Sequence, residues 1–234
     1  MRYSGGKSRV KKQISGYLNE SRQPGQPYWE PFVGPCWVLM GITGDDLTFA
    51  SDACQPLILM WQRLQRGWRP PEQVTKTQYA AARRGEYDAA TTAFVGFGCS
   101  WGGMWFAGYA RGEGRNWAKE SQASALKKAR ATQHVHFFAA DFLTCYPPAQ
   151  GCLIYCDPPY AGTTGYKAEG PFDHAAFWER VRWYEAHGHT CVVSEYEAPD
   201  DFGCVLEIPT RTSLTTRNEK ERRTERLFRL RSSL

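Results

Sequence analysis

An apolar run that ends in two consecutive prolines limits the fold of this chain more than any other stretch. Residues 151–160 read Gly-Cys-Leu-Ile-Tyr-Cys-Asp-Pro-Pro-Tyr. Residues 153–155 suit a buried central strand, and the prolines end it because they remove two backbone donors and fix φ. Asp157 and Tyr160 therefore follow the carboxyl end of a strand, the edge at which open α/β sheets bind ligands. A strand followed by a proline-rich turn without a role would read the same.

Strand-like and helix-like segments alternate along most of the chain. Strands are expected over residues 47–52, 133–138, 190–196 and 204–208, and in a strand-turn-helix pattern over 28–39. Helices are expected over 9–18, 55–68, 76–84, 121–130 and 174–187, the last capped by Asp173. This alternation predicts an α/β fold with a mostly parallel sheet and helices on both faces.

A segment rich in glycine and aromatic residues interrupts the alternation. Residues 94–111 interleave glycines with large rings, a mixture that few regular elements tolerate. We expect an inserted subdomain over 59–129, which divides the surrounding domain into residues 1–58 and 130–234. The rings could stack on bases or wedge between them, or they could pack on one another beneath a helix.

Small and acidic residues follow several of the expected strands. Gly34 lets the backbone turn tightly beside a ligand, and Asp52 lies at the distance from it at which an acid typically accepts hydrogen bonds from ribose hydroxyls. Asp141 and Phe142 follow a later strand, where an adenine ring could be held. Turn geometry alone also places Gly and Asp at strand ends.

The first residues contain Gly5-Gly6-Lys7, which is not a P-loop. Met1 occupies the position of the first glycine that such a loop needs, and no strand can precede it. The sequence predicts a turn that enters a helix and offers backbone donors and the Lys7 cation to an anionic group.

Composition gives weaker indications. The formal charge of +5 and the pI near 8.8 favour a polyanionic partner mildly, and basic residues gather over 2–12, 111–130 and 211–231, although solvated helix faces are also rich in Lys and Arg. The eight cysteines contain no Cys-x-x-Cys pair and are expected to be reduced, and a cytoplasmic, non-membrane protein is expected. His134 and His136 share a strand face without a third ligand nearby, so no metal is expected.

The strand end at 157–160 suits chemistry on an exocyclic amine, and Asp-Pro-Pro-Tyr is the signature of methyltransferases that modify such amines. The N6 amine of adenine is a poor nucleophile because its lone pair is delocalised into the ring. Asp157 and the Pro158 carbonyl could each accept one of its hydrogens, Pro159 adds rigidity and Tyr160 offers a face for the base.

The chain resembles the Dam-type DNA adenine-N6 methyltransferases, of the phage-encoded kind, nearly end to end. The matching motifs, in the family's order, are Tyr3 with Gly5-Gly6-Lys7, Glu30-Pro31-Phe32-Val33-Gly34, Asp52, Asp141-Phe142, Asp157-Pro158-Pro159-Tyr160 and the tail from Arg211 through Glu225-Arg226-Leu227. One departure is Cys36, preceded by Pro35, where a second glycine is common. This departure would change the geometry of the loop and could change the affinity for the methyl donor.

The resemblance implies a Rossmann-like methyltransferase sheet, S-adenosylmethionine as co-substrate, double-stranded DNA as partner, a flipped-out adenine and an inserted hairpin that reads DNA. It implies donor contacts from Tyr3, Lys7, Phe32, Gly34, Asp52, Asp141, Phe142, Asp157 and Tyr166. DNA contacts are expected from Trp101, Trp105, Arg111, Arg115, Lys119 and Arg217.

Two other functions fit parts of the same pattern. A methyltransferase could act on cytosine N4 or on RNA, but cytosine enzymes usually carry Ser at the position of Asp157. A DNA-binding protein could keep the fold without catalysis, which the intact 157–160 motif and the two supporting acids, Asp52 and Asp141, disfavour. GATC is the family's default recognition sequence; the site of this chain depends on which side chains meet base edges.

Overall fold

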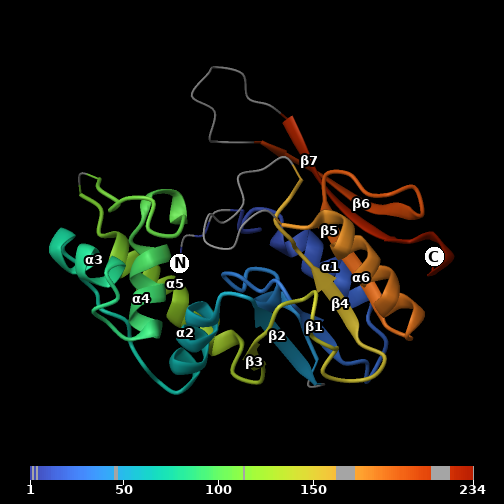
Figure 1. The fold of residues 1–234 in the computed structure, drawn as a ribbon, viewed down its shortest axis with the longest axis horizontal. Helices are drawn as coiled ribbons and strands as arrows, with labels where there is room; N and C mark the ends of the chain where they lie inside the picture. The colour runs from blue at the N-terminus through green and yellow to red at the C-terminus, as the bar shows by residue number, and fades with distance from the viewer. Residues whose placement is uncertain are drawn as a thin grey trace.

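Seven strands form a single sheet at the centre of the protein. The computed structural model describes residues 1, 3, 5–44, 47–112, 114–161, 172–211 and 222–233. Within these residues the strands lie in the order β3-β2-β1-β4-β5-β7-β6 (Figure 1). The strands are β1 (Tyr28–Glu30), β2 (Thr48–Asp52), β3 (His136–Ala139), β4 (Leu153–Cys156), β5 (Thr190–Glu195), β6 (Phe202–Arg211) and β7 (Arg222–Leu230).

The strand directions define the fold class. β1 is parallel to both β2 and β4, and the pairs β2–β3 and β4–β5 are also parallel. β7 is antiparallel to β5 and to β6, so the chain reaches the edge strand β6 before it returns to fill the place beside β5. The first five strands follow the Rossmann order 3-2-1-4-5. With the antiparallel β7 inserted beside β5, the sheet is Rossmann-like, which confirms the predicted α/β class with a mostly parallel sheet.

Helices cover both faces of the sheet because side chains of a strand alternate between its faces. From β4, Leu153 and Tyr155 enter the hydrophobic cluster that contains Ile14 and Trp61, whereas Ile154 enters a second cluster with the aromatic residues of 177–184. The helices are α1 (Lys11–Ser21), α2 (Gln55–Gln65), α3 (Lys76–Arg83), α4 (Ala89–Gly98), α5 (Trp117–Ala131) and α6 (His174–Ala186), with short 3₁₀ turns η1 (Leu39–Gly41), η2 (Trp101–Gly103) and η3 (Arg231–Ser233).

Helix caps explain where two of these helices begin. The Asp173 carboxylate accepts a hydrogen bond from the Ala176 N–H at 2.9 Å, which confirms the predicted cap of α6. α5 starts at Trp117, before the predicted Ser121, because the Asn116 side chain accepts a hydrogen bond from the Lys119 N–H at 3.0 Å. Side-chain capping thus decides the boundary that apolar periodicity left open.

Residues 94–98 correct one expectation from the sequence. They form the end of helix α4, although the mixture of glycine and aromatic residues was expected to oppose regular structure. The glycines serve close packing: a Cβ atom at Gly96 would lie 2.7 Å from the Trp105 ring, and one at Gly98 would lie 3.0 Å from Ser121. The sequence analysis also did not predict the strand β7.

Helices α3, α4 and α5 form a layer beside the β3 end of the sheet, at the left of Figure 1. We call residues 76–131 the helical layer. α4 packs on α2, α3 and α5. In the described part of this layer, Ser100 and Tyr109 form one isolated antiparallel bridge. The DNA-reading hairpin that the resemblance implies stays a prediction. No helix among the described residues is long and apolar enough to cross a membrane.

Two helical glycines provide a matched test of this packing. A Cβ atom at Gly16 in α1 would meet nothing within 4 Å, whereas one at Gly96 would meet two aromatic rings. We expect Gly16→Ala to raise the free energy of unfolding by about 0.5–1 kcal/mol through helix propensity, and Gly96→Ala to lower it by about 1–2 kcal/mol through overpacking. Urea denaturation measures both changes. An equal gain in stability from the two substitutions would contradict the packing of Trp105 on α4.

Candidate active site

The carboxyl ends of β1, β2 and β4 meet at one edge of the sheet. The register pairs Glu30 with Ala50 and Trp29 with Ile154, so the segments that follow these strands emerge side by side. They are the turn 31–36, the segment after Asp52 and the motif 157–160. This edge is where open α/β sheets bind their ligands.

Asp52 fastens the turn around Gly34. The Gly34 N–H donates to Asp52 Oδ2 and the Cys54 N–H donates to Asp52 Oδ1, both at 3.0 Å. On the other side, the Trp61 indole N–H donates to the Gly34 carbonyl at 3.0 Å. A Cβ atom at Gly34 would lie 3.2 Å from the Tyr3 ring, and φ here is +44°. Glycine is therefore required, and three of the predicted donor residues, Tyr3, Gly34 and Asp52, come together.

Cys36 adopts the backbone conformation that a second glycine would favour. Its φ is +54°, in the left-handed region, and its N–H donates to the Val33 carbonyl at 2.9 Å to close the turn. Left-handed geometry costs a residue with a side chain about 1–2 kcal/mol. Cys36, where the resemblance expects a second glycine, therefore keeps a backbone conformation that glycine would adopt without strain.

Lys7 and the 157–160 motif form a buried polar cluster with a residue of β7. Lys7 Nζ lies 2.6 Å from Asp157 Oδ1, 3.6 Å from Glu225 Oε1 and 4.4 Å from the centroid of the Tyr160 ring. The Tyr160 hydroxyl donates to Glu225 Oε1 at 2.5 Å. The Asp157 side chain keeps 19% of its surface exposed, against 9% for Lys7 and for Glu225. We call Lys7, Asp157, Tyr160 and Glu225 the polar cluster.

Burial and charge set the ionisation of the cluster. Burial raises the pKa of Asp157 to about 6, the Lys7 ammonium opposes this rise, and the Glu225 carboxylate adds to it. For Lys7, burial favours the neutral amine, but the carboxylates of Asp157 and Glu225 outweigh it, so its pKa is raised. At neutral pH the site holds a charged lysine and an Asp157 carboxylate that is close to its protonation range.

Glu195 is a site residue that the sequence analysis missed, and Glu225 is one that it named only as part of the matching tail, without a role. The Glu195 side chain, 2% exposed, accepts the Ala161 N–H at 2.8 Å and the Tyr196 N–H at 2.7 Å, and so ties the end of the motif to β5. The Tyr196 ring meets the Tyr160 ring edge-on at 4.8 Å between centroids. Glu195 ends an apolar strand as Asp157 does, so the same strand-end rule could have found it. Glu225 lies in the strand that the sequence did not predict.

A further acid, Glu30, lies beneath the site at the end of β1. It is 3% exposed and accepts a hydrogen bond from the Tyr28 hydroxyl at 3.2 Å. Burial raises the pKa of Glu30 well above its ordinary value, and the Asp157 carboxylate adds to the rise. Burial and the nearby Asp157 carboxylate thus both favour the protonated form of Glu30.

The predicted adenine-binding pair divides between surface and core. Asp141 is exposed and its Oδ1 accepts the Leu143 N–H at 2.9 Å, while the neighbouring Ala140 N–H donates to the Asp52 carbonyl at 3.2 Å. Phe142 is 2% exposed and packs on the half-buried Phe32 at 5.1 Å between ring centroids. Phe142 thus supports Phe32 from the core, and its direct contact with the donor stays a prediction, as does that of Tyr166, which lies outside the described residues.

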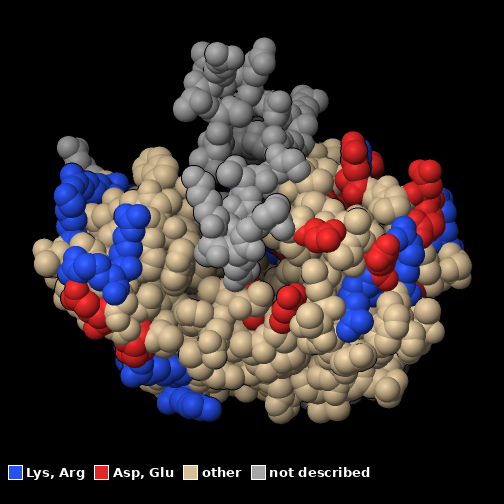
Figure 2. Space-filling model, viewed as in Figure 1, with Lys and Arg blue, Asp and Glu red and all other residues tan. Residues whose placement is uncertain are grey.

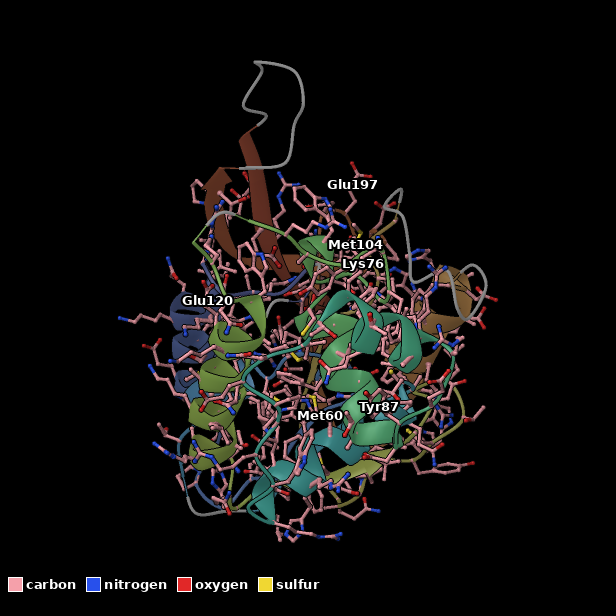
Figure 3. The ribbon with its side chains drawn as sticks, turned by 90° about the vertical axis from the view of Figure 1, so that its left-hand side faces the viewer. Met60, Lys76, Tyr87, Met104, Glu120 and Glu197 are labelled. Carbon is pink, nitrogen blue, oxygen red and sulfur yellow. The ribbon has the colours of Figure 1, made fainter. Side chains whose placement is uncertain are left out.

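The predicted DNA-binding residues differ in how accessible they are. Trp101 is 62% exposed on η2. Met104, which follows η2 in the chain, is 41% exposed and lies in the upper half of the view in Figure 3. Trp105 is half-buried against the Phe97 ring at 4.7 Å. Arg111 and Lys119 are exposed, and Arg217 lies outside the described residues.

Arg115 already has partners within the protein. Its guanidinium bonds to the Glu120 carboxylate through Nε at 3.0 Å and Nη2 at 2.7 Å, and lies 3.8 Å from the Trp117 ring centroid. On the face shown in Figure 2, Lys and Arg gather at the left, over the end where Figure 1 places the helical layer, with a few acidic residues below them. Acidic residues also lie near the middle, and basic and acidic residues are mixed at the right.

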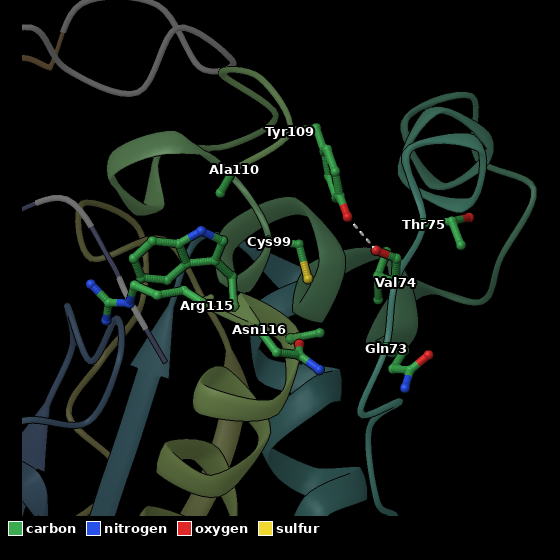
Figure 4. Close-up of a pocket in the computed structure, with 10 residues that line it drawn as sticks. Gln73, Val74, Thr75, Cys99, Tyr109, Ala110, Arg115 and Asn116 are labelled. Carbon is green, nitrogen blue, oxygen red and sulfur yellow. Dashed lines mark hydrogen bonds between the residues drawn. The ribbon is translucent and has the colours of Figure 1, made fainter. Parts of the chain in front are cut away.

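A cavity of about 280 Å³ lies in the helical layer, apart from the polar cluster (Figure 4). The loop before α3 and the start of α5 form its walls, and the Tyr109 hydroxyl donates to the Val74 carbonyl at 2.6 Å inside it. Its lining residues are Gln73, Val74, Thr75, Cys99, Tyr109, Ala110, Arg115, Asn116, Trp117 and Ala118. None of them belongs to the polar cluster or the Gly34 turn. The cavity is therefore separate from the candidate active site at the edge of the sheet.

The described residues contain no group of three or more His, Cys, Asp or Glu side chains placed to hold a metal ion. No disulfide joins any of the eight cysteines.

Comparison with known proteins gives structural likenesses to solved proteins, without a match at the level of sequence families. No protein-family profile and no curated protein sequence matches the chain. One solved structure that resembles it is that of SMU.472, described as "a putative methyltransferase complexed with SAH", with 10% sequence identity and a TM-score of 0.38. The match covers 96% of this chain and 53% of that protein, so the chain spans about half its length. At this distance the likeness carries no argument, and the fold class rests on the sheet order and strand directions.

The polar cluster gives a direct electrostatic test. NMR titration of aspartate carboxyl carbons, with Asp157 assigned by comparison with Asp157→Asn, should give a midpoint at about 6 for Asp157. Lys7→Met removes the nearest cation, so the midpoint should move to higher pH. Lys12→Met, which replaces an exposed lysine of the same segment, should leave it unchanged. A midpoint that stays in place in Lys7→Met would rule out the ion pair.

Proposed function

We propose that the protein transfers a methyl group from S-adenosylmethionine to the N6 amine of an adenine flipped out of duplex DNA. The observation that carries this proposal is the polar cluster itself. It places a carboxylate, a lysine and a tyrosine at the carboxyl end of β4, beside the Gly34 turn of a Rossmann-like sheet. This position of the polar cluster supports ligand binding at the edge of the sheet and chemistry on an amine at Asp157.

The residues around the Gly34 turn suit the methyl donor. Asp52 and the exposed Asp141 end neighbouring strands and offer carboxylate oxygens to ribose hydroxyls, while the half-buried Phe32 offers a ring to adenine. The other predicted donor contacts are Tyr3, Gly34, Lys7, Phe142, Asp157 and Tyr166. When bound, S-adenosylmethionine supplies an activated methyl group on a sulfonium.

The target amine would be held by the motif after β4. Asp157 and the Pro158 carbonyl accept its two hydrogens, which favours a tetrahedral nitrogen with a localised lone pair. Because the pKa of Asp157 is about 6, the acceptor is largely a carboxylate at neutral pH. Tyr160 is 9% exposed, with Lys7 over its ring, so a base stacks on it only after a neighbouring side chain moves.

The helical layer suits contact with DNA. A base inside a duplex cannot reach the polar cluster, and flipping it out costs a few kcal/mol. The exposed Trp101 and Met104 are apolar groups that can wedge into a base step, and Arg111 and Lys119 are cations for phosphates. We therefore propose that the DNA contacts come from residues 59–129, a segment that also supplies Trp61 and Lys128 to the turn around Gly34, with Arg217 as a further phosphate contact.

Methylation assays test the reaction. Incubation with tritiated S-adenosylmethionine and duplex DNA, then digestion to nucleosides, should yield labelled N6-methyl-2′-deoxyadenosine. Asp157→Asn should lower the rate by at least about 10²-fold, because it removes a preorganised acceptor at the reacting nitrogen, while DNA affinity changes little.

The same assays separate the alternatives. N4-methylcytosine as the sole product, or transfer to RNA alone, would exclude the adenine reaction in DNA. Failure of S-adenosylmethionine to bind in calorimetry would favour a DNA-binding protein without catalysis. Near-normal turnover of Asp157→Asn would refute the catalytic assignment.

Trp101 tests the role of the helical layer. Trp101→Ala should weaken duplex DNA binding about tenfold or more, the equivalent of a lost stacking contact, and leave donor affinity unchanged. Tyr146→Ala is a matched control, since Tyr146 is an exposed ring (68%) outside the helical layer. Fluorescence anisotropy with a labelled duplex measures both. Equal effects of the two substitutions would contradict DNA binding through η2.

A further inference from the structure

We propose that Lys128 is a positioning residue that holds the Pro35–Cys36 peptide in the conformation needed for donor binding, and so replaces the second glycine of the turn. The assignment of this turn to the donor rests on the proposed function. The clamp itself rests on the geometry of described residues.

The turn contains a backbone conformation that its residue does not favour. Among the described residues, Cys36 and Phe106 are the non-glycine residues with positive φ, and Cys36 has φ +54°. Such a conformation persists only where the surroundings determine it. Some contact must therefore keep Cys36 in the left-handed region.

Hydrogen bonds hold both ends of the peptide unit that joins Pro35 to Cys36. Its N–H donates to the Val33 carbonyl at 2.9 Å, and its C=O accepts from Lys128 Nζ at 2.5 Å. Rotation of this peptide plane changes ψ of Pro35 and φ of Cys36 together. Lys128 therefore acts on the dihedral angle that is strained.

Lys128 is held by a ring and a carbonyl rather than by an acid. It is 1% exposed, its Nζ lies 3.4 Å from the centroid of the Trp37 ring, and no carboxylate among the described residues pairs with it. Burial lowers its pKa to about 7, the interaction with Cys36 opposes this, and the nearby Lys11 adds to it. Burying an amine without an acid is costly, so a lysine here is explained by its contacts with the Pro35 carbonyl and the Trp37 ring.

The clamp connects the helical layer to the donor turn. Lys128 comes from α5, while the turn it holds continues into Gly34, whose N–H binds Asp52 and whose carbonyl binds Trp61. A shift of the Pro35–Cys36 peptide would displace Gly34 and its bond to Asp52. Lys128 thereby sets donor affinity without touching the donor.

A double-mutant cycle tests the clamp. Lys128→Met should weaken binding of S-adenosylhomocysteine about tenfold in the wild-type and Cys36→Ala backgrounds, because both keep a Cβ atom at the strained position. In the Cys36→Gly background the same substitution should cost less than about threefold, since glycine adopts positive φ without strain. Lys127→Met, which replaces an exposed neighbour on α5, should have no effect. Calorimetry measures each affinity.

An equal loss in all three backgrounds would overturn the proposal and leave Lys128 as an ordinary core residue. If the wild-type protein binds no S-adenosylhomocysteine, the proposed function fails, and thermal unfolding without ligand tests the clamp alone. The fall in Tm caused by Lys128→Met should then be smaller in the Cys36→Gly background than in the Cys36→Ala background, and equal falls would overturn the clamp. If the Lys128→Met variant fails to fold, the added substitution Cys36→Gly should restore folding, which would support the clamp. If neither Cys36→Gly nor Cys36→Ala restores folding, the clamp is overturned.

Discussion

The ion pair between Lys7 and Asp157 is the interaction on which the rest of the site depends. Both side chains are largely removed from water, and a buried pair of charges is maintained only when its geometry and its further hydrogen bonds are good. Here the N-terminal turn supplies the cation, β4 supplies one carboxylate and β7 supplies Glu225 as the second. Removal of Lys7 would leave two buried carboxylates without their cation, and removal of Glu225 would take away the acceptor of the Tyr160 hydroxyl, so the three segments are energetically coupled.

The antiparallel insertion of β7 between β5 and β6 explains how this cluster is built. It brings Glu225 from near the end of the described chain to Tyr160 and Lys7, which lie far from it in sequence. Glu30, Glu195 and Glu225 surround Asp157 with acids, and Lys7 is the cation among them. Burial, together with the Glu225 carboxylate, keeps the pKa of Asp157 near 6 despite the lysine.

Much of the fold could be predicted from sequence, because local rules govern it. Proline ended β4, apolar periodicity located α2, and Asp173 capped α6. The failures came where packing overrides such rules. α4 tolerates its glycines because rings from the following loop, Trp105 among them, fill the space beside them. β7 was missed because its charged residues alternate with few apolar ones, and only its neighbours in the sheet make it a strand.

The sequence by itself determined that an acid, two prolines and a tyrosine would follow a buried strand, and that glycine and aspartate would end the strands beside it. Chain connectivity and backbone sterics suffice for that. Only the tertiary structure decided that Lys7 pairs with Asp157, that Glu225 orients Tyr160 and that Lys128 grips the Pro35 carbonyl. These contacts join segments 65 to 150 residues apart, and their existence depends on how helices and strands pack, which no local pattern encodes.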